Sequence, residues 1–248
     1  MINVWTFQFN NPDFLEYQHK TFSKFLKQEH KLICVNNSFD KPHEKEAIRA
    51  TAERLGIQHI VPESTDPRSG GYGHQHALNW AWHKFIFHSS DVNIIVDHDM
   101  FPIREVPIDL SYDIVGVMQG RGEHIRYFHP GIMIINNTLK DKETVDFKGE
   151  QIDGHWCDSG GNWHHYLNAH PDLKIKGLSL VNICAEHENL HVIPEQFREG
   201  YNEQDPIQYL ENYILHFRNG SNWAWTEQGI YNRKIEQMKQ TLDYYLSL

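Results

Sequence analysis

The sequence predicts an α/β fold in which helices flank a central, mostly parallel sheet. Over the first hundred residues, short apolar runs alternate with amphipathic stretches of helical period, in the order strand, helix, strand, helix, strand, helix, strand. Strands that alternate with helices in this way pair in parallel and are covered on both faces. The chain has 248 residues, of which 40% are hydrophobic, so it can build one sizeable core. Because no Gly/Ser/Pro-rich linker or internal repeat interrupts it, we expect a single domain over residues 1–248.

Local signals near the start of the chain predict the first three elements. Residues 2–9 are apolar and aromatic enough for a strand. Asn11 and Pro12 supply an N-cap and a first-turn proline, which predicts a helix to about Lys27. Residues 31–35 are a second apolar run, and turn-forming polar residues follow it.

The same signals predict the next four elements. Pro42 opens a second helix whose apolar stripe ends at Gly56, a residue suited to a helix C-cap. Residues 57–61 form a third short strand. Apolar pairs recur every four positions over 77–86, which predicts a third helix, and the apolar run 93–97 is the fourth strand. Ligands of such sheets bind beyond the carboxyl ends of the strands. The end of the run 93–97 therefore lies at the expected binding site.

The second half of the chain is less regular. Its strand-like runs are separated by long loops rich in His, Trp and Gly, and such loops usually carry specificity. An amphipathic pattern at the end predicts one further helix. The expected strands are 113–118, 131–136, 178–184 and 213–217, and the expected helix is 231–248.

The most informative motif is Asp97-His98-Asp99, at the end of the fourth strand. On an extended backbone, side chains two residues apart point the same way, so Asp97 and Asp99 should lie side by side. Two carboxylates this close repel each other unless one is protonated or a cation neutralises both. Oxygen ligands suit Mg²⁺ or Mn²⁺, which keep positions for water and substrate phosphates. The motif predicts a metal site for a diphosphate-bearing substrate, unless it is only a polar exit from the strand into a turn.

Charge and composition narrow the class of partner. The formal net charge of −10 argues against nucleic acid, because phosphate backbones are bound by clustered Lys and Arg. No apolar run approaches the ~20 residues of a membrane span. The three cysteines, Cys34, Cys157 and Cys184, lack a paired spacing and are expected to be reduced, mostly buried thiols. Because the first residues carry no secretory pattern, we expect a cytoplasmic protein.

The order of the elements and several motifs together resemble the GT-A fold of nucleotide-sugar-dependent glycosyltransferases, of the family-2-like kind with an Asp-x-Asp motif. The resemblance implies that residues 1–105 form the nucleotide-binding half and residues 106–248 the sugar and acceptor half. Independent chance matches would not fall in the family's order along the chain. The similar segments are Phe7-Gln8-Phe9-Asn10-Asn11-Pro12, Val35-Asn36-Asn37-Ser38, Gly71-Tyr72-Gly73 with Asn79, Asp97-His98-Asp99, residues 131–136 after His129-Pro130, and Leu215-His216-Phe217-Arg218-Asn219-Gly220.

The resemblance implies a metal site and a set of donor-binding residues. Mn²⁺ or Mg²⁺ would be held by Asp97, Asp99 and His216, although a histidine inside an apolar strand can also be an ordinary core residue. Asn36 stands where many members place an acidic residue that reads the base, which leaves the nucleobase open. We favour a UDP-sugar because it is the commonest donor among similar enzymes. The implied donor-binding residues are Phe7, Gln8, Asn36, Asn37, Gly73, His76, Asn79, Asp97 and His98.

Asp158, in the Gly-flanked segment 153–161, is the candidate catalytic carboxylate. It would deprotonate an acceptor hydroxyl in an inverting reaction or orient the sugar in a retaining one. The segment lacks the paired acidic motif of many inverting members, so the stereochemistry stays open, and a plain loop or N-cap role is the alternative. Trp156 and Trp163 are candidates for stacking on sugar faces. The adjacent pair His164-His165 is a candidate for binding hydroxyls, or else forms a solvated helix face.

The predicted activity is transfer of a sugar from a nucleoside diphosphate sugar to a hydroxyl of a glycan or other acceptor. A phosphatase of the haloacid-dehalogenase type is one alternative, but that family places Asp-x-Asp near its first strand, and no Gly-Asp-x-x-x-Asp run follows here. A GT-A scaffold that binds a sugar or nucleotide without turnover is another, because a fold alone does not prove activity. Retention of both motif carboxylates favours an enzyme. The oligomeric state is left open.

Overall fold

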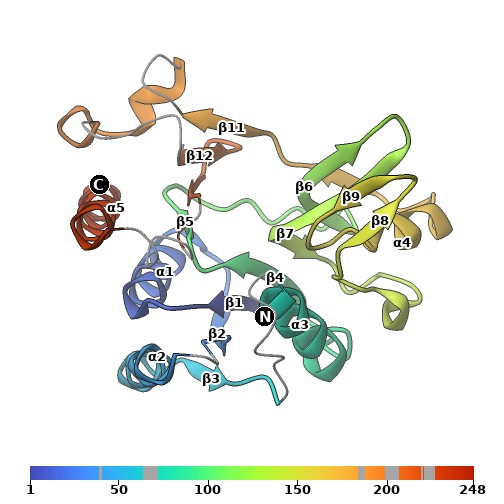
Figure 1. Ribbon diagram of the computed structural model, residues 1–248, viewed down its shortest axis with the longest axis horizontal. Helices are drawn as coiled ribbons and strands as arrows, with labels where there is room; N and C mark the ends of the chain where they lie inside the picture. Colours follow the sequence, from blue (N-terminus) through green and yellow to red (C-terminus); the bar gives the residue numbers. More distant parts are fainter. Residues whose placement is uncertain (39–40, 64–71, 184–187, 199–206, 219, 221–226) are drawn as a thin grey trace.

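The computed structural model describes residues 1–38, 41–63, 72–183, 188–198, 207–218, 220 and 227–248, and its centre is a seven-stranded sheet (Figure 1). Neighbouring strands pair in parallel except at the third strand across the sheet, which runs antiparallel to both of its neighbours. The predicted α/β class with a mostly parallel central sheet is therefore confirmed. Across the sheet the strands are β10 (Ile175–Gly177), β6 (Ile114–Arg121), β7 (Ile125–Ile135), β4 (Val92–Asp97), β1 (Ile2–Gln8), β2 (His30–Asn36) and β3 (Gln58–Ile60).

The helices of the first half begin and end close to the predicted residues. They are α1 (Pro12–Phe25), α2 (Pro42–Leu55) and α3 (Tyr72–Ala81), which continues into a π-helical turn, η1 (Trp82–Ile86). The Asn11 side chain accepts a hydrogen bond from the Asp13 backbone N–H at 2.8 Å, so it caps α1 as expected. Gly56 ends α2 with a left-handed φ of 67°, a conformation that glycine adopts without strain.

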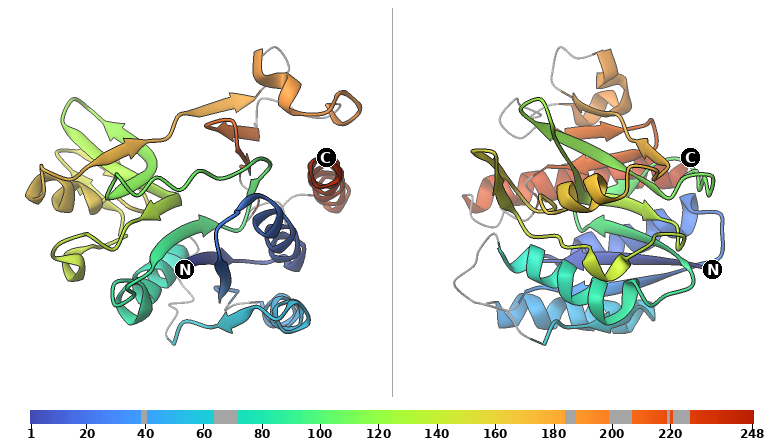
Figure 2. Two further views of the ribbon diagram at one scale, coloured as in Figure 1. Left: turned by 180° about the vertical axis from the view of Figure 1, so that it is seen from behind. Right: turned by 90° about the vertical axis from the view of Figure 1, so that its right-hand side faces the viewer.

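A second, antiparallel sheet lies beside the first (Figure 2). Its strands, in order, are β11 (Leu180–Ile183), β12 (Ile207–Leu210), β13 (Ile214–Phe217) and β5 (Met100–Pro102). The runs that became β11 and β13 were predicted as strands, whereas β5 and β12 were not. A two-residue turn separates β5 from β4, so the chain passes directly from the central sheet into the second one.

The remaining elements pack around these sheets. The hairpin of β8 (Glu150–Ile152) and β9 (His155–Cys157) precedes α4 (Trp163–Ala169), which packs on β7. The C-terminal helix α5 (Gln228–Ser247) packs on α1 (Figure 1). The described segments also contain the short 3₁₀ helices η2 (Lys142–Thr144), η3 (Glu188–Val192) and η4 (Glu195–Phe197).

Two hydrophobic cores lie on opposite faces of the central sheet. Along β4, Ile94 and Val96 belong to the core under α1 and α2, while Ile95 belongs to the core under α3. This alternation has the period of two that a strand imposes on its side chains. The sheet is therefore covered by helices on both faces, as an α/β arrangement requires.

Two of the three cysteines lie in the described part of the chain. Cys34 and Cys157 are buried free thiols, as predicted, and Cys184 lies outside the described residues. Burial raises the pKa of both thiols, which keeps them protonated. None of the described helices combines the length and the apolar character that a membrane span requires.

Candidate functional site

The carboxyl ends of β1 and β4 meet at the point where the strand order of the central sheet reverses. From β1 the chain moves to β2 and β3 on one side, and it then returns to β4 on the other side of β1. In open α/β sheets, ligands bind in the crevice outside the strand ends at such a switch point. Phe7 pairs with Asp97 in this register, so the Asp-x-Asp motif lies directly at the crevice.

Asp99 is buried and is held by one residue of β13 and by one that follows it. The register of β13 against β5 pairs His216 with Met100, and this brings the His216 Nε2 atom to 3.4 Å from Oδ1 of Asp99. The other carboxylate oxygen accepts a hydrogen bond from the Gly220 backbone N–H at 3.0 Å. A Cβ atom at Gly220 would lie 2.7 Å from the Asp99 Cβ atom, so this close approach needs glycine.

Asp97 faces a histidine from a different element. His74, in the first turns of α3, places its Nε2 atom 3.1 Å from Oδ1 of Asp97. His98, between the two acids, is buried against the Phe14 ring at 5.0 Å between centroids. Its Nε2 atom is buried and makes no hydrogen bond to any residue in the described segments.

A fourth histidine, His129 of β7, completes this group. Its Nδ1 atom accepts a hydrogen bond from the Gly131 backbone N–H at 3.0 Å. Burial lowers the His129 pKa and the nearby His216 lowers it further, while the negative charges of Asp97 and Asp158 raise it. His129 is thus electrostatically coupled to the Asp97–Asp99 turn and to the Asp158 loop.

The negative charges of Asp97 and Asp99 are stabilised mainly by neighbouring imidazole rings. Burial raises the Asp97 pKa, but the opposing effect of His74, with His129 and His98, is larger and leaves this pKa well below its usual range. Asp99 also has a lowered pKa, because His216 and His98 outweigh burial and the repulsion from Asp97. Burial lowers the His74 pKa, but the adjacent Asp97 raises it above its ordinary value. The site therefore keeps two carboxylates ionised, the buried Asp99 and the half-buried Asp97.

The donor set of this turn fits a divalent cation in part. Asp99 and His216 lie close enough to share one ion, and the buried His98 Nε2 atom lacks a protein partner within the described chain. Carboxylate oxygen and imidazole nitrogen are ligands that Mn²⁺ accepts. Within the described part of the chain, no three His, Cys, Asp or Glu side chains converge in a metal-binding geometry. A bound ion would therefore take its remaining ligands from substrate or water.

The predicted donor-binding residues of β1 are buried. Phe7 is 1% exposed and lies edge-on to the His74 ring, with 5.8 Å between centroids. Gln8 donates from Nε2 to Thr6 Oγ1 at 2.6 Å and to Gln18 Oε1 at 2.7 Å. Both of its amide hydrogens thus serve the protein's own interior, and a donor role for either residue stays a prediction.

The two asparagines after β2 differ in their hydrogen bonds. Asn36 Nδ2 donates to the Lys45 carbonyl at 2.9 Å, and its Oδ1 accepts from the Ser38 backbone N–H at 3.1 Å. Asn37 is also buried, but its Oδ1 atom has no hydrogen-bond partner among the residues that the structure describes. An unpaired buried carbonyl costs free energy, so Asn37 is better suited than Asn36 to accept a bond from a ligand.

The predicted residues of α3 have separate surroundings. Gly73 is buried and His76 is exposed. Asn79 donates to Asp146 Oδ1 at 2.7 Å and accepts from the Phe147 backbone N–H at 2.9 Å, which anchors the loop before β8. The structure therefore uses the Asn79 amide within the protein, and its predicted contact with a donor is untested.

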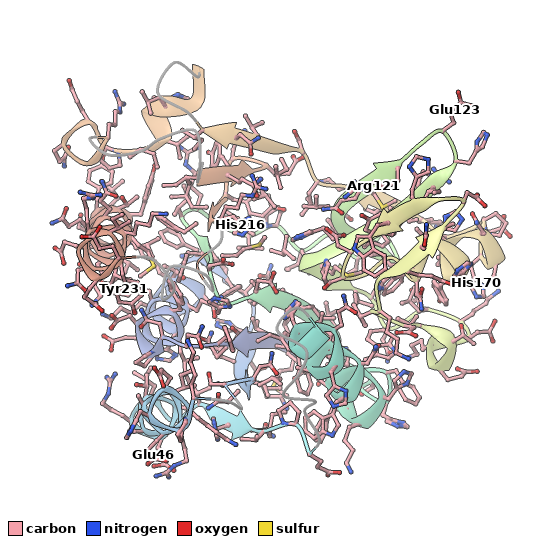
Figure 3. The ribbon with its side chains drawn as sticks, viewed as in Figure 1. Glu46, Arg121, Glu123, His170, His216 and Tyr231 are labelled. Carbon is pink, nitrogen blue, oxygen red and sulfur yellow. The ribbon has the colours of Figure 1, made fainter. Side chains whose placement is uncertain are left out.

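Asp158 directly follows β9, and its side chain is half-exposed. Its Oδ1 atom accepts a hydrogen bond from the buried Tyr127 hydroxyl at 2.9 Å, and its Oδ2 atom lies 4.0 Å from the Arg121 guanidinium. In Figure 3, Arg121 lies on the side of the molecule formed by β6 to β9, whereas His216 lies nearer its centre. The carboxylate is oriented by one bond and open to solvent, as a group that exchanges a proton should be.

The structure corrects two predictions near Asp158. Trp163 is fully buried among the rings of Trp82, Phe128, Phe147 and Tyr166, so it cannot stack on a sugar. Trp156, by contrast, is 56% exposed. The expectation of a solvated pair of histidines is also wrong for His164, which is buried and hydrogen-bonds to Asn168 at 2.9 Å.

Sequence reasoning did not identify His74, His129 or Tyr127 as part of the site. His74 follows a Gly-rich segment, and His129 lies two residues before Gly131. Histidines close to glycines were therefore the signal in the sequence that could have pointed to these two residues. Neither residue has a spacing to Asp97 that local geometry would detect. Their contacts depend on how α3 and β7 pack against β4.

Comparison with known proteins adds a weak likeness to solved structures. No family model and no curated protein sequence matches the chain. A mannosyltransferase from Pyrobaculum calidifontis, in complex with GDP-Man and Mn²⁺, is 17% identical with a TM-score of 0.42, and the match covers 71% of this chain and 54% of that one. The galactosyltransferase LgtC, in complex with donor and acceptor sugar analogs, is 14% identical over 58% of this chain and 62% of its own, with a TM-score of 0.35.

A third solved structure is the glycosyltransferase GlyE of Streptococcus pneumoniae, which is 12% identical with a TM-score of 0.41. The match covers 99% of this chain and 63% of that one. This chain therefore spans 54% to 63% of the length of these three structures. All three are glycosyltransferases by name, and at these scores the likeness carries no conclusion about function.

Proposed function

We propose that this chain is a metal-dependent glycosyltransferase that moves a sugar from a nucleoside diphosphate sugar to an acceptor hydroxyl, in the synthesis of a glycan. One observation carries the proposal: two ionised carboxylates, the buried Asp99 and the half-buried Asp97, lie at the switch point of an α/β sheet, and His216 from a separate sheet contacts Asp99. A site with this charge repels a diphosphate unless a cation lies between them.

Asp99 and His216 would hold the cation, Mn²⁺ or Mg²⁺, with Asp97 beside them. When bound, the ion would neutralise the negative charge that develops on the leaving nucleoside diphosphate. The protein's own part is to keep both carboxylates ionised, which the surrounding imidazoles do. Burial of the turn strengthens every electrostatic interaction made there.

The nucleobase would lie at the ends of β1 and β2. The Asn37 Oδ1 atom is a buried acceptor with no partner in the described segments, and the imide N–H of uracil or the N–H groups of guanine can donate to such an atom. We favour UDP over GDP. Phe7, Asn36 and the residues of α3 then shape the donor pocket, and Gln8 adds a second buried acceptor, because its Oε1 atom has no partner among the described residues.

Asp158 would be the general base of an inverting reaction. It accepts the proton of the acceptor hydroxyl while that oxygen bonds to the anomeric carbon, and the bond from this carbon to the diphosphate oxygen breaks with its electron pair. The hydrogen bond from Tyr127 leaves Oδ2 as the oxygen that meets the acceptor. In a retaining reaction, the same carboxylate would orient the sugar. The exposed Trp156, two residues earlier, offers a ring face to the acceptor sugar.

Calorimetric titration of the purified protein with UDP and GDP, each with Mn²⁺ and then with EDTA, tests the donor site. We expect binding in Mn²⁺ only, and tighter binding of UDP. Equal affinity in both buffers would remove the metal from the proposal, and tighter binding of GDP would reverse the choice of base. Hydrolysis of UDP-sugars is then measured. Nucleotide binding without hydrolysis or transfer would identify a binding module rather than an enzyme.

A further inference from the structure

A buried side chain of α1 hydrogen-bonds to the backbone of the Asp97–Asp99 turn. Gln18 is 0% exposed, and its Nε2 atom donates to the Asp97 carbonyl at 2.7 Å and to the Met100 carbonyl at 3.0 Å. A carboxamide nitrogen carries two hydrogens, so both are used here. The two acceptors lie on either side of His98 and Asp99, and one amide therefore spans the turn.

The other end of the Gln18 amide is anchored to β1. Its Oε1 atom accepts hydrogen bonds from the Thr6 hydroxyl and from Gln8 Nε2, the latter at 2.7 Å. Gln8 Nε2 also donates to Thr6 Oγ1 at 2.6 Å, and both residues are 0% exposed. The donors and the acceptor of the Gln18 amide are thus all satisfied away from water. Buried hydrogen bonds that are satisfied in this way rigidify the structure around them, although in the described residues the Gln8 Oε1 atom of the network has no partner.

The same turn is also held by β13. The Phe217 backbone N–H donates to the Asp99 carbonyl at 2.9 Å, next to the contact between His216 and Asp99. Asp97 ends β4 and Met100 begins β5, so neither strand continues its ladder through the turn. Gln18 supplies the hydrogen bonds on the side of the turn that faces α1 and β1.

We propose that Gln18 is a positioning residue for the cation site, acting through the backbone of the Asp97–Asp99 turn. The proposal rests on the proposed function only for the nature of the ligand. Groups that orient metal ligands from outside the coordination sphere typically change metal affinity by about 10-fold to 100-fold when they are removed. Gln18 touches no substrate, so its loss changes how the carboxylates are presented and leaves their chemistry intact.

The test compares Gln18→Leu with Thr21→Val in the full-length chain. Thr21 is also fully buried in α1, and its hydroxyl donates to the Gln18 backbone carbonyl at 3.3 Å, so its variant perturbs the same helix without reaching the turn. Affinity for Mn²⁺ is measured by titration in the presence of UDP. We expect a dissociation constant about tenfold higher for Gln18→Leu, and an unchanged one for Thr21→Val.

Amide hydrogen exchange in the peptide covering residues 97–102 is the second readout, and global unfolding is measured alongside. Exchange there should be faster in Gln18→Leu than in Thr21→Val at equal global stability. An unchanged Mn²⁺ affinity in Gln18→Leu overturns the proposal. The proposal is also overturned if both variants lose Mn²⁺ affinity in proportion to their loss of global stability.

Two further outcomes are distinguishable. If Gln18→Leu does not fold, Thr6→Val removes one of the two donors to Gln18 Oε1, and a smaller loss of Mn²⁺ affinity is expected; no loss overturns the proposal. If the wild-type protein binds neither Mn²⁺ nor UDP, the proposed function fails. Hydrogen exchange then still decides whether Gln18 holds the turn, and equal exchange in both variants overturns that role.

Discussion

The Asp97–Asp99 turn and the Asp158 loop both present carboxylates, but they are built in different ways. The turn is buried, and its acids contact histidines from α3 and from β13. Asp158 is half-exposed and contacts Tyr127 and Arg121 of neighbouring strands. A buried, ionised pair suits the binding of a strongly charged ligand, whereas an exposed carboxylate on a single hydrogen bond suits proton exchange. The difference supports the proposal of donor binding at one region and acceptor chemistry at the other.

Asp158→Asn is expected to have the largest effect, and on turnover alone. Removal of a general base typically lowers the rate ~100-fold to 10,000-fold and leaves ground-state contacts largely intact. Transfer from a UDP-sugar to an acceptor is measured together with the affinity for UDP and Mn²⁺. Near-normal transfer would move the role to Asp153 or Glu150, and a variant that does not fold would make Asp158 a structural cap.

Trp163→Ala and Trp156→Ala should separate the buried and exposed sides of the Asp158 region. Trp163 is fully enclosed by aromatic rings, so its loss should lower the free energy of unfolding by about 3–5 kcal/mol. Trp156 is exposed, and its loss should change stability by less than ~0.5 kcal/mol. Urea denaturation checks both values. Similar losses in the two variants would contradict the assignment of Trp156 as a free surface ring.

Asp99→Asn should weaken the donor site at little change in shape. Loss of a buried charged ligand should cost at least ~2 kcal/mol of binding free energy, or about 30-fold in the dissociation constant. The effect is measured by titrating UDP in Mn²⁺, with Asp158→Asn as the matched control that keeps its affinity. If the two variants lose UDP affinity to the same extent, the proposal that the two regions have separate roles is wrong.

Asp146→Asn should have the smallest effect, and one that depends on pH. Burial raises the Asp146 pKa, but hydrogen bonds from the Lys148 backbone, Asn79 and Asn162 outweigh burial and lower it. A lowered pKa in the folded state stabilises the protein above the unfolded value of about 4, and this contribution disappears as the pH falls through the folded value. The variant should therefore lose about 1 kcal/mol at pH 7, and the gap should close below pH ~4.

The matched control for this pH series is Trp163→Ala, because it removes no titratable group. Its loss of stability should stay constant from pH 7 down to the pH at which the Asp146→Asn gap closes. Urea denaturation at each pH measures both gaps. A gap for Asp146→Asn that does not change with pH would mean that packing, and not the carboxylate charge, anchors the loop before β8.

Much of the fold followed from the sequence alone. The Asn11 cap, the Gly56 C-cap and the apolar runs of β1 to β4 are local signals, and the structure places each element close to the predicted residues. The alternation of strands and helices also predicted the parallel pairing of the first four strands. These features depend on backbone conformation and side-chain period over a few residues, which the sequence displays directly.

The site itself was decided by tertiary structure. The Gly220 amide reaches Asp99 across 121 residues of sequence, and His216 arrives through the register of β13 against the three-residue strand β5. Gln8 became part of the Gln18 network, and Trp163 became a core residue. The Asp97-His98-Asp99 motif after an apolar run predicted carboxylates at the end of β4. Which side chains surround them depends on strand register and helix packing between distant segments, and no local pattern in the sequence encodes that geometry.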